Sequence, residues 1–388
     1  MKKKTSLVFA VLAMCMIYLP YVHSYTDSKA QVYVHEPVEL LYTIYHLTPA
    51  AKQFIRSTKR QRDWVDAMIE PLMRPFQSYG DHPAVQAMIA LGEQYSIWLP
   101  TLTNVGVQNR ELPLQPLRYT NTDNPELEMQ LRAFIELANQ FAKDTKFREL
   151  FAERRPIYSA IEKEVQDHMP DATFFETMES FYQKQFHSYN LCPSPLLPAG
   201  NGMGFGPNWK EGDKVMIFNV FSGVTQPNTD PSNIVKADGH YGYPAYWVRD
   251  MSAHEFGHSF VNAPLFQYTA TLKKYEHYLK PIKKKMKRQG YWNWNTVMAE
   301  HLVRLGEIRI ADRLGMPEDS RKKLYYNQVD RHFIYLPHLL KVMQQYENNE
   351  AYATFESFIP VLLDSLAELD VKAARQAWKK EKRKRKKA

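Results

Sequence analysis

The sequence predicts an α+β fold in which helices predominate and a small sheet lies in the second half of the chain. Residues 38–186 read as successive amphipathic helices that proline and glycine interrupt. Residues 214–221 are instead rich in β-branched and aromatic side chains and end at Ser222 and Gly223, which is typical of a strand. The 388 residues, 44% of them hydrophobic, suffice for one large domain or two ordinary ones.

The chain begins with a predicted signal peptide, residues 1–24. Residues 2–4 are lysines, residues 7–19 are almost entirely apolar, and Val22 and Ser24 offer small side chains before a cleavage site at Tyr25. This order of charged, apolar and small residues predicts export to the periplasm or the outside of the cell. An uncleaved membrane anchor is the alternative, since the apolar run approaches the length of a short span.

Cysteine usage predicts a core without disulfides. Removal of the signal peptide would leave Cys192 as the only cysteine, so no internal disulfide could form. Its neighbours Leu191 and Pro193 give no indication of a nucleophile, and we interpret Cys192 as an inert thiol. Lipidation at Cys15 is an alternative to simple cleavage of the signal.

Two regions follow the signal peptide: a helical region, residues 25–190, and a metallohydrolase core, residues 191–375. In the first, residues 127–138 carry an apolar stripe at helical spacing. The stripe consists of Leu127, Leu131, Phe134, Ile135 and Ala138. The second opens with residues 193–207, where crowded prolines and glycines predict an irregular segment with glycines at turns and strand entries.

The positive charge of the chain is concentrated at its ends. The formal net charge is +8, yet residues 379–387 carry eight positive charges and one negative charge, and the lysines at 2–4 add three more. The remaining body is slightly acidic, which predicts no nucleic-acid partner. Residues 376–388 read as a disordered basic tail that can contact anionic surfaces electrostatically.

The motif that carries chemistry is His-Glu-Phe-Gly-His at residues 254–258. His254 and His258 are four residues apart, so on a helix they share one face and can bind one zinc ion. Glu255 is rotated by about 100° from His254, where its carboxylate can take a proton from water that the zinc activates. Gly257 costs about 1 kcal/mol inside a helix, which predicts the close approach of a neighbouring strand.

The third zinc ligand is predicted on a second helix, residues 292–307. Glu300, Arg304 and Glu307 fall on one face of this helix, whose other residues are mostly apolar. A charge on a core-facing stripe is costly unless it is paired or bound to a metal. We therefore assign Glu300 as the third ligand of Zn2+, and Arg304 as its companion or as a catalytic group that contacts the substrate.

Further groups are expected around the metal. Asn262 lies one turn after His258 and Asp250 lies one turn before His254, so either can orient a ligand histidine. Tyr335 is the predicted donor to the oxyanion that forms during hydrolysis.

Three segments carry a resemblance to a known family. They are HEFGHSFVN at residues 254–262, WNWNTVMAEHLVR at 292–304 and HFIYLPHLL at 332–340. The combination resembles a bacterial family of exported HExxH proteins that is catalogued only as a domain of unknown function. The similarity lies mostly within residues 190–365.

The resemblance implies a gluzincin-like zinc metallopeptidase with a zincin-like core, made of a small sheet and the HExxH helix. In that arrangement His254, His258 and Glu300 bind zinc and Glu255 acts as general base. The resemblance does not imply a substrate, and a peptide or protein is the substrate we expect from the metallopeptidase prediction. Residues 215–221 would form the edge strand beside the cleft, to which a peptide can add by main-chain hydrogen bonds.

Two other interpretations remain. The chain could be a non-enzymatic envelope protein in which a structural or vestigial zinc site supports a binding module. A closed structural site would need a fourth ligand such as His301 or His277, and Glu276 and His277 are also alternatives to the third ligand. Zinc-assisted hydrolysis of a non-peptide amide or ester is the other interpretation.

Overall fold

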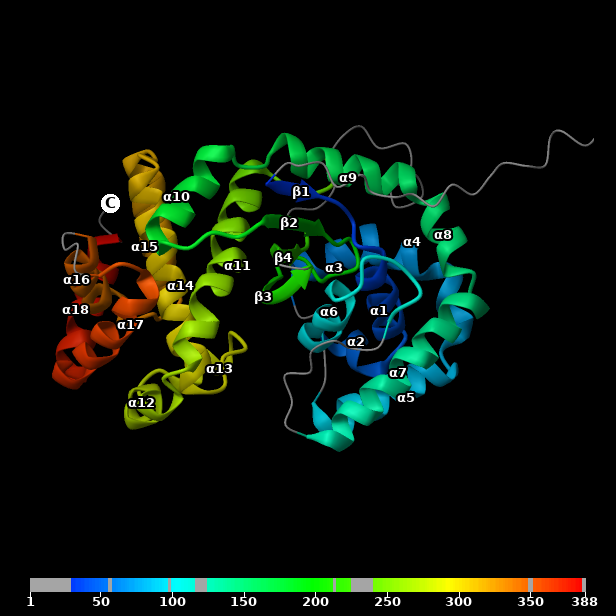
Figure 1. Ribbon diagram of the computed structural model, residues 1–388, viewed down its shortest axis with the longest axis horizontal. Coiled ribbons are helices and arrows are strands. Elements are labelled where there is room, and N and C mark those ends of the chain that lie inside the picture. The colour runs from blue at the N-terminus through cyan, green and yellow to red at the C-terminus, as the bar shows by residue number, and fades with distance from the viewer. Residues whose placement is uncertain are drawn as a thin grey trace, which may run out of the picture.

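The computed structural model describes residues 29–54, 58–96, 99–115, 124–211, 214–224, 240–347 and 352–385. The predicted signal peptide lies outside these residues. The predicted α+β class is confirmed, because most described residues are helical and four strands form one mixed sheet. Figure 1 shows the sheet in the middle of the molecule, with the N-terminal helices on one side and the C-terminal helices on the other.

The sheet consists of β1 (Ala30–Val32), β2 (Ser188–Pro193), β3 (Gly202–Glu211) and β4 (Lys214–Phe221), in the order β1-β2-β4-β3. β1, β2 and β4 run parallel, and β3 is antiparallel to β4. The strand predicted over residues 214–221 is confirmed as β4. Its predicted place at the edge of the sheet is wrong, because β4 pairs with β2 on one side and with β3 on the other.

Part of the predicted irregular segment, residues 193–207, belongs to the edge strand β3 instead. Glycine here lets the helix that carries the histidine motif, α11 (Ala245–Phe266), lie directly against the strand. A Cβ atom on Gly204 would stand 1.9 Å from the backbone oxygen of Glu255, and one on Gly202 would stand 2.8 Å from its Oε1 atom. These two glycines serve a close strand–helix contact rather than turns.

The first half of the chain folds into helices, as predicted. These are α1 (Glu36–His46), α2 (Pro49–Phe54), α3 (Lys59–Trp64), η1 (Val65–Ile69), α4 (Glu70–Met73), η2 (Arg74–Tyr79), α5 (Pro83–Tyr95), α6 (Leu99–Val107), α7 (Pro125–Asp144), α8 (Phe147–Glu153), α9 (Arg155–Asp167) and α10 (Ala172–Tyr182). The side chain of Asn124 caps α7, and Pro125 occupies its first position. All five residues of the predicted apolar stripe are buried along α7.

The N-terminal helices and the region from residue 191 onward share one sheet and one hydrophobic core. The Trp64 indole donates a hydrogen bond to the carbonyl oxygen of Pro195 at 3.1 Å, and the Ser194 hydroxyl donates to Glu39. Cys192 on β2 is 1% exposed, and burial raises the pKa of its thiol, as expected for an unreactive group. Buried contacts therefore join the two predicted regions on either side of residue 190.

The C-terminal half surrounds α11 with further helices. These are α12 (Thr269–Lys274), η4 (Glu276–Leu279), α13 (Lys283–Lys287), α14 (Trp294–Arg313), α15 (Glu318–Asp330), α16 (Leu336–Glu347), α17 (Phe355–Asp364), η5 (Ser365–Glu368) and α18 (Val371–Arg385). Among the described residues, no helix combines the length and the apolar character needed to cross a membrane.

The basic tail, predicted as disordered from residue 376 onward, is helical up to Arg385 and forms the end of α18. The Trp378 indole donates to the carbonyl oxygen of Val329 at 2.6 Å, and Ala374 is buried. Tertiary packing of this kind stabilises helices whose sequence alone would be marginal. The tail is therefore docked on the core through its first turns, while its lysines and arginines remain at the surface.

A buried carboxyl group in α1 makes the stability of the fold depend on pH. Glu39 is 1% exposed, and burial raises its pKa from 4.5 to about 8, against the opposing effects of Ser194 and Arg154. Between these pH values the folded chain holds a proton that the unfolded chain has released, so stability falls as pH rises. At about 1.4 kcal/mol per pKa unit, the loss reaches roughly 4–5 kcal/mol.

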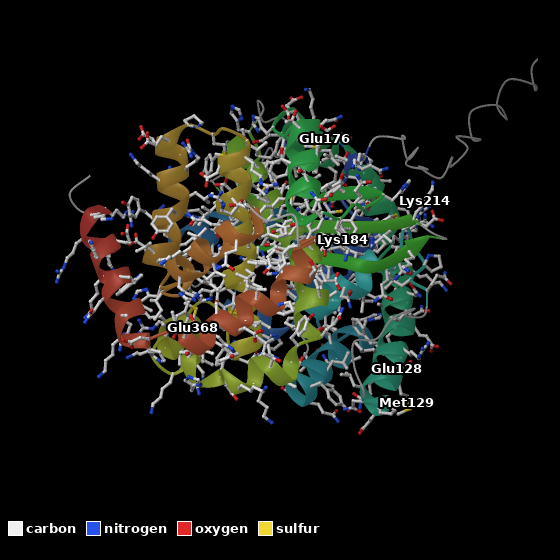
Figure 2. The ribbon with its side chains drawn as sticks, turned by 60° about the vertical axis from the view of Figure 1, so that its left-hand side comes forward. Glu128, Met129, Glu176, Lys184, Lys214 and Glu368 are labelled. Atoms are coloured by element: carbon white, nitrogen blue, oxygen red, sulfur yellow. The ribbon has the colours of Figure 1, made fainter. Side chains whose placement is uncertain are left out.

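Replacing Glu39 with glutamine is expected to remove this dependence. The variant should exceed the wild type in free energy of unfolding near pH 8, and the difference should shrink toward pH 5, as measured by urea unfolding across that range. Glu176→Gln is the control, at an exposed position that Figure 2 shows at the surface of the molecule. If the free energies of unfolding of the wild type and of Glu39→Gln changed in parallel with pH, Glu39 would not be the group responsible for the pH dependence.

Candidate metal centre

The centre lies where α11 and α14 pack side by side (Figure 1). His254 and His258 are one turn apart on α11, and Glu300 belongs to α14. Gly257 permits the close packing, since a Cβ atom there would lie 3.1 Å from Cγ1 of Val303 on α14. The prediction that a strand approaches Gly257 is therefore corrected: its close neighbour is a helix, and the strand β3 meets other residues of α11.

The three residues predicted as metal ligands converge. One ligand atom from each of His254, His258 and Glu300 lies within 4.8 Å of the others, and the group could hold a metal ion. Nε2 of His254 is 3.6 Å from Oε2 of Glu300, and Nε2 of His258 is 3.4 Å from Oε1. Tetrahedral zinc ligands with bonds of about 2.0–2.1 Å are about 3.3–3.4 Å apart. The donor set and its spacing therefore fit zinc.

A second side chain orients each histidine. Nδ1 of His254 donates a hydrogen bond to Glu307, and Nδ1 of His258 donates to Oδ1 of Asn262 at 3.2 Å. In a neutral ring that donates from Nδ1, the Nε2 atom carries a lone pair, so both Nε2 atoms, which face Glu300, can each offer a lone pair to a cation. Asn262 thus takes the orienting position expected of it.

Glu300 is held by a network of charged and polar groups. Nη2 of Arg304 donates to Oε2 of Glu300 at 2.9 Å and to the hydroxyl oxygen of Tyr291 at 3.2 Å. The same hydroxyl accepts a hydrogen bond from Arg331 at 3.3 Å. Arg304 is only 2% exposed and packs over the ring of Phe333, 4.7 Å from its centroid. The structure therefore places Arg304 as the companion of Glu300 rather than as a group that reaches solvent.

Burial and charge act in opposite directions on the ligands. Burial raises the pKa of Glu300, but Arg304 and the two histidines outweigh burial and hold that pKa well below its usual value. Burial lowers the pKa of His258, but the hydrogen bond and charge of Glu300 outweigh burial and raise that pKa to about 9 when protein groups alone are counted. A divalent cation bound between the Nε2 atoms and the Glu300 carboxylate would displace the proton that Glu300 keeps on His258.

Glu255 lies beside this cluster and is 5% exposed. Burial raises its pKa; His254 and His258 act to lower it, and Glu300 acts to raise it. Gly202 of β3 makes room for the carboxylate, because a Cβ atom at that position would lie 2.8 Å from Oε1. A carboxylate of raised pKa in this place can accept a proton from a group bound next to the ligands.

Two predicted site residues lie elsewhere. Tyr335 is fully buried, and its hydroxyl donates to the carbonyl oxygen of Tyr278 at 2.6 Å, so its only proton is already engaged in the core. The prediction that Tyr335 stabilises an oxyanion is therefore wrong. Asp250 accepts hydrogen bonds from the adjacent Arg249 instead of orienting His254.

The alternative ligands do not join the centre. Glu276 and His277 are exposed, and His301 is buried with Nδ1 2.7 Å from the carbonyl oxygen of Val297. Burial lowers the pKa of His301 to about 4. Within the part of the chain that the structure describes, the cluster has three members. A tetrahedral ion held by these three alone would keep one position for a ligand from outside the protein.

The sequence assigned no role to Glu307, Tyr291 or Gln328. Glu307 falls on the same buried face as Glu300. Because burying a second carboxylate there is costly without a partner, its position was a signal that it contacts the site. Gln328 on α15 lies 3.4 Å from Oε2 of Glu307. Tyr291 and Gln328 have no comparable signal, because their contacts join segments that are adjacent only after folding.

One family model matches the part of the chain that contains this centre. The family model of a domain of unknown function, DUF4932, matches residues 121–365, which is more than half of the chain and contains every residue of the cluster. The chain matches no curated protein and no solved structure. By the extent of the family match, the chain belongs to the DUF4932 family.

Proposed function

We propose that this protein is a zinc-dependent hydrolase, and specifically a metallopeptidase. The observation that carries the proposal is the convergence of His254, His258 and Glu300 in one group, with Glu255 next to His254 on α11 and within range of the charges of all three. Two imidazoles and one carboxylate are the ligands of many catalytic zinc sites, which keep an open position for substrate or water. A zinc ion bound there would act as a Lewis acid toward the scissile carbonyl group and would lower the pKa of water.

The protein groups around the metal would carry the proton. Glu255 would accept a proton from the attacking water at a carboxylate oxygen and then deliver it to the leaving amine. Burial raises the pKa of Glu255, which moves it toward the neutral range where one group can both accept and release a proton. Arg304 would keep Glu300 ionised and therefore fit to bind a cation.

Tyr291 is the group we propose for stabilising the oxyanion. Its hydroxyl oxygen accepts hydrogen bonds from both Arg304 and Arg331, so the single hydroxyl proton is left for donation. Burial raises the pKa of Tyr291 to about 12, which keeps the hydroxyl protonated. Tyr291→Phe should therefore lower turnover without loss of zinc; unchanged turnover would exclude this role.

The edge strand β3 supports a peptide as substrate. It pairs with β4 on one side, and Gly202 and Gly204 bring it into contact with Glu255. Among the described strands, β3 pairs only with β4, and an extended peptide that added to its other edge would lie alongside the cluster. Methylation of the peptide's backbone amides should abolish cleavage if this pairing positions the substrate.

The test is cleavage of a fluorescence-quenched peptide library by the full chain loaded with one equivalent of zinc. Cleavage is expected, together with its loss on chelation and its return when zinc is restored. A parallel panel of esters and non-peptide amides separates the peptidase from a wider hydrolase. If the zinc-loaded protein leaves peptides, esters and amides intact, the hydrolase proposal fails.

A further inference from the structure

Two lysine-rich segments that are far apart in the sequence meet on one surface of the protein. One is residues 283–288, which contain α13, and the other is residues 379–385 at the end of α18. The residue between them is His332: burial lowers its pKa, and so do the nearby charges of Lys285 and Lys382. We call the exposed lysines and arginines of both segments, together with Arg331, the basic surface.

Specific contacts fix this juxtaposition. Gln289, directly after α13, accepts a hydrogen bond from Nε of Arg331 at 3.0 Å and donates to its backbone oxygen at 2.8 Å. On the other side, Trp378 of α18 donates to the carbonyl oxygen of Val329, and its ring lies 4.8 Å from that of His332. The end of α15 therefore holds both basic segments in place.

The charge of the basic surface is poorly neutralised. Glu381 pairs with Lys384 at 2.8 Å, and Asp330 pairs with Arg385. Within the described ranges, no ion pair involves a lysine of α13. In Figure 2 the side chains of α18 end in blue nitrogen atoms that point away from the molecule. Concentrated like charges repel one another unless an anionic partner neutralises them.

An exposed aromatic residue accompanies these charges. Trp292 is 64% exposed, more than any other large aromatic residue described, and Nζ of Lys287 lies 5.1 Å from the centroid of one of its rings. Tryptophan with an exposed apolar body and an N–H group prefers the interface between water and lipid headgroups. Lysines beside it can contact lipid phosphates at the same depth.

We propose that the basic surface binds anionic phospholipid bilayers peripherally, with Trp292 entering the headgroup region. A bilayer fits this surface better than a nucleic acid does. Ammonium groups outnumber guanidinium groups, whereas phosphate recognition in nucleic acids favours the planar fork of arginine. Lys287 also occupies a face of the Trp292 ring that a base would need for stacking.

The test is co-sedimentation of the full chain with vesicles of phosphatidylcholine containing about 30% phosphatidylglycerol. Binding is expected to these vesicles, to weaken in high salt and to be absent with phosphatidylcholine alone. Replacing the four lysines of α13 by glutamine should weaken binding at least about 100-fold, since each basic residue contributes about fivefold. Trp292→Ala should weaken it about tenfold.

A matched control removes the same charge elsewhere: Lys59, Lys143, Lys163 and Lys214 to glutamine, all at exposed positions. Figure 2 shows Lys214 at the side of the molecule opposite to α18. This control should bind vesicles like the wild type. If the control lost as much vesicle binding as the α13 variant, the net charge of the protein, and not the basic surface, would govern binding.

Two further results would overturn the proposal: binding to heparin or duplex DNA without binding to anionic vesicles, and full vesicle binding by the α13 variant. The proposal does not depend on the metal centre. Zinc content should therefore be unchanged in every variant, and failure of vesicle binding would leave the proposed hydrolase function untouched.

Discussion

Replacing Glu255 with glutamine is expected to lower the turnover of a cleaved peptide by about 10²–10⁴-fold while zinc remains bound. Glutamine preserves the size of the side chain in the narrow space beside Gly202, but its amide cannot accept the proton. The three groups that would hold the metal, His254, His258 and Glu300, are unchanged in this variant. The measurement is kcat/KM together with zinc per chain on the same preparation.

The matched control is Glu39→Gln, which changes another buried glutamate far along the chain from the cluster. It should keep full turnover. A Glu255→Gln variant with more than about a tenth of wild-type turnover would exclude Glu255 as general base, and loss of zinc would mean that Glu255 holds the metal. Zinc without turnover in both the wild type and the variant would favour a structural site in a binding protein.

Replacing Glu300 with glutamine is expected to weaken zinc binding by more than about 100-fold, beyond the 10–100-fold typical of groups that only orient a ligand. The substitution removes the negative charge of the carboxylate, whose Oε2 atom faces Nε2 of His254 and whose Oε1 atom faces Nε2 of His258. It also leaves Arg304, which is 2% exposed, without its 2.9 Å carboxylate partner. An unneutralised buried cation next to the site would disfavour a second cation.

Glu307→Gln is the comparison variant, for which a smaller loss of zinc affinity is expected than for Glu300→Gln. Glu300 and Glu307 are both 5% exposed on α14, but Glu307 reaches the cluster through Nδ1 of His254 and not through an Nε2 atom. We expect its substitution to weaken zinc binding by about 10–100-fold, measured by competition with a chromogenic chelator. An equal or larger loss for Glu307→Gln would show that the ligand assignment is wrong.

Much of the fold could be predicted because its signals are local. The apolar stripe of α7 repeats with the helical period, and the run of β4 is rich in β-branched and aromatic residues and ends at Ser222 and Gly223, so both were found at the correct residues. Strand β3 was missed because glycine-rich sequence is ambiguous. Gly202 and Gly204 read as turn residues until α11 is seen to lie against them.

Polar residues of the site were harder to assign than the fold. Tyr335 and Tyr291 are both tyrosines near the predicted helices, and nothing in the sequence distinguishes them. In the folded chain one hydroxyl donates into the core and the other lies between two arginines. The direction of a side chain depends on how its helix is rotated against its neighbours, which the sequence does not express locally.

By itself the sequence determined which chemistry this chain can carry. Helical spacing places His254 and His258 on one face, with Glu255 beside it. The charges of Glu300, Arg304 and Glu307 mark the face of α14 where buried charges require ion-pair or metal partners. Only the tertiary structure decided which carboxylate faces the Nε2 atoms and which orients an imidazole. Those choices depend on the closeness of α11 and α14, which Gly257 permits, and on contacts between residues more than 40 positions apart.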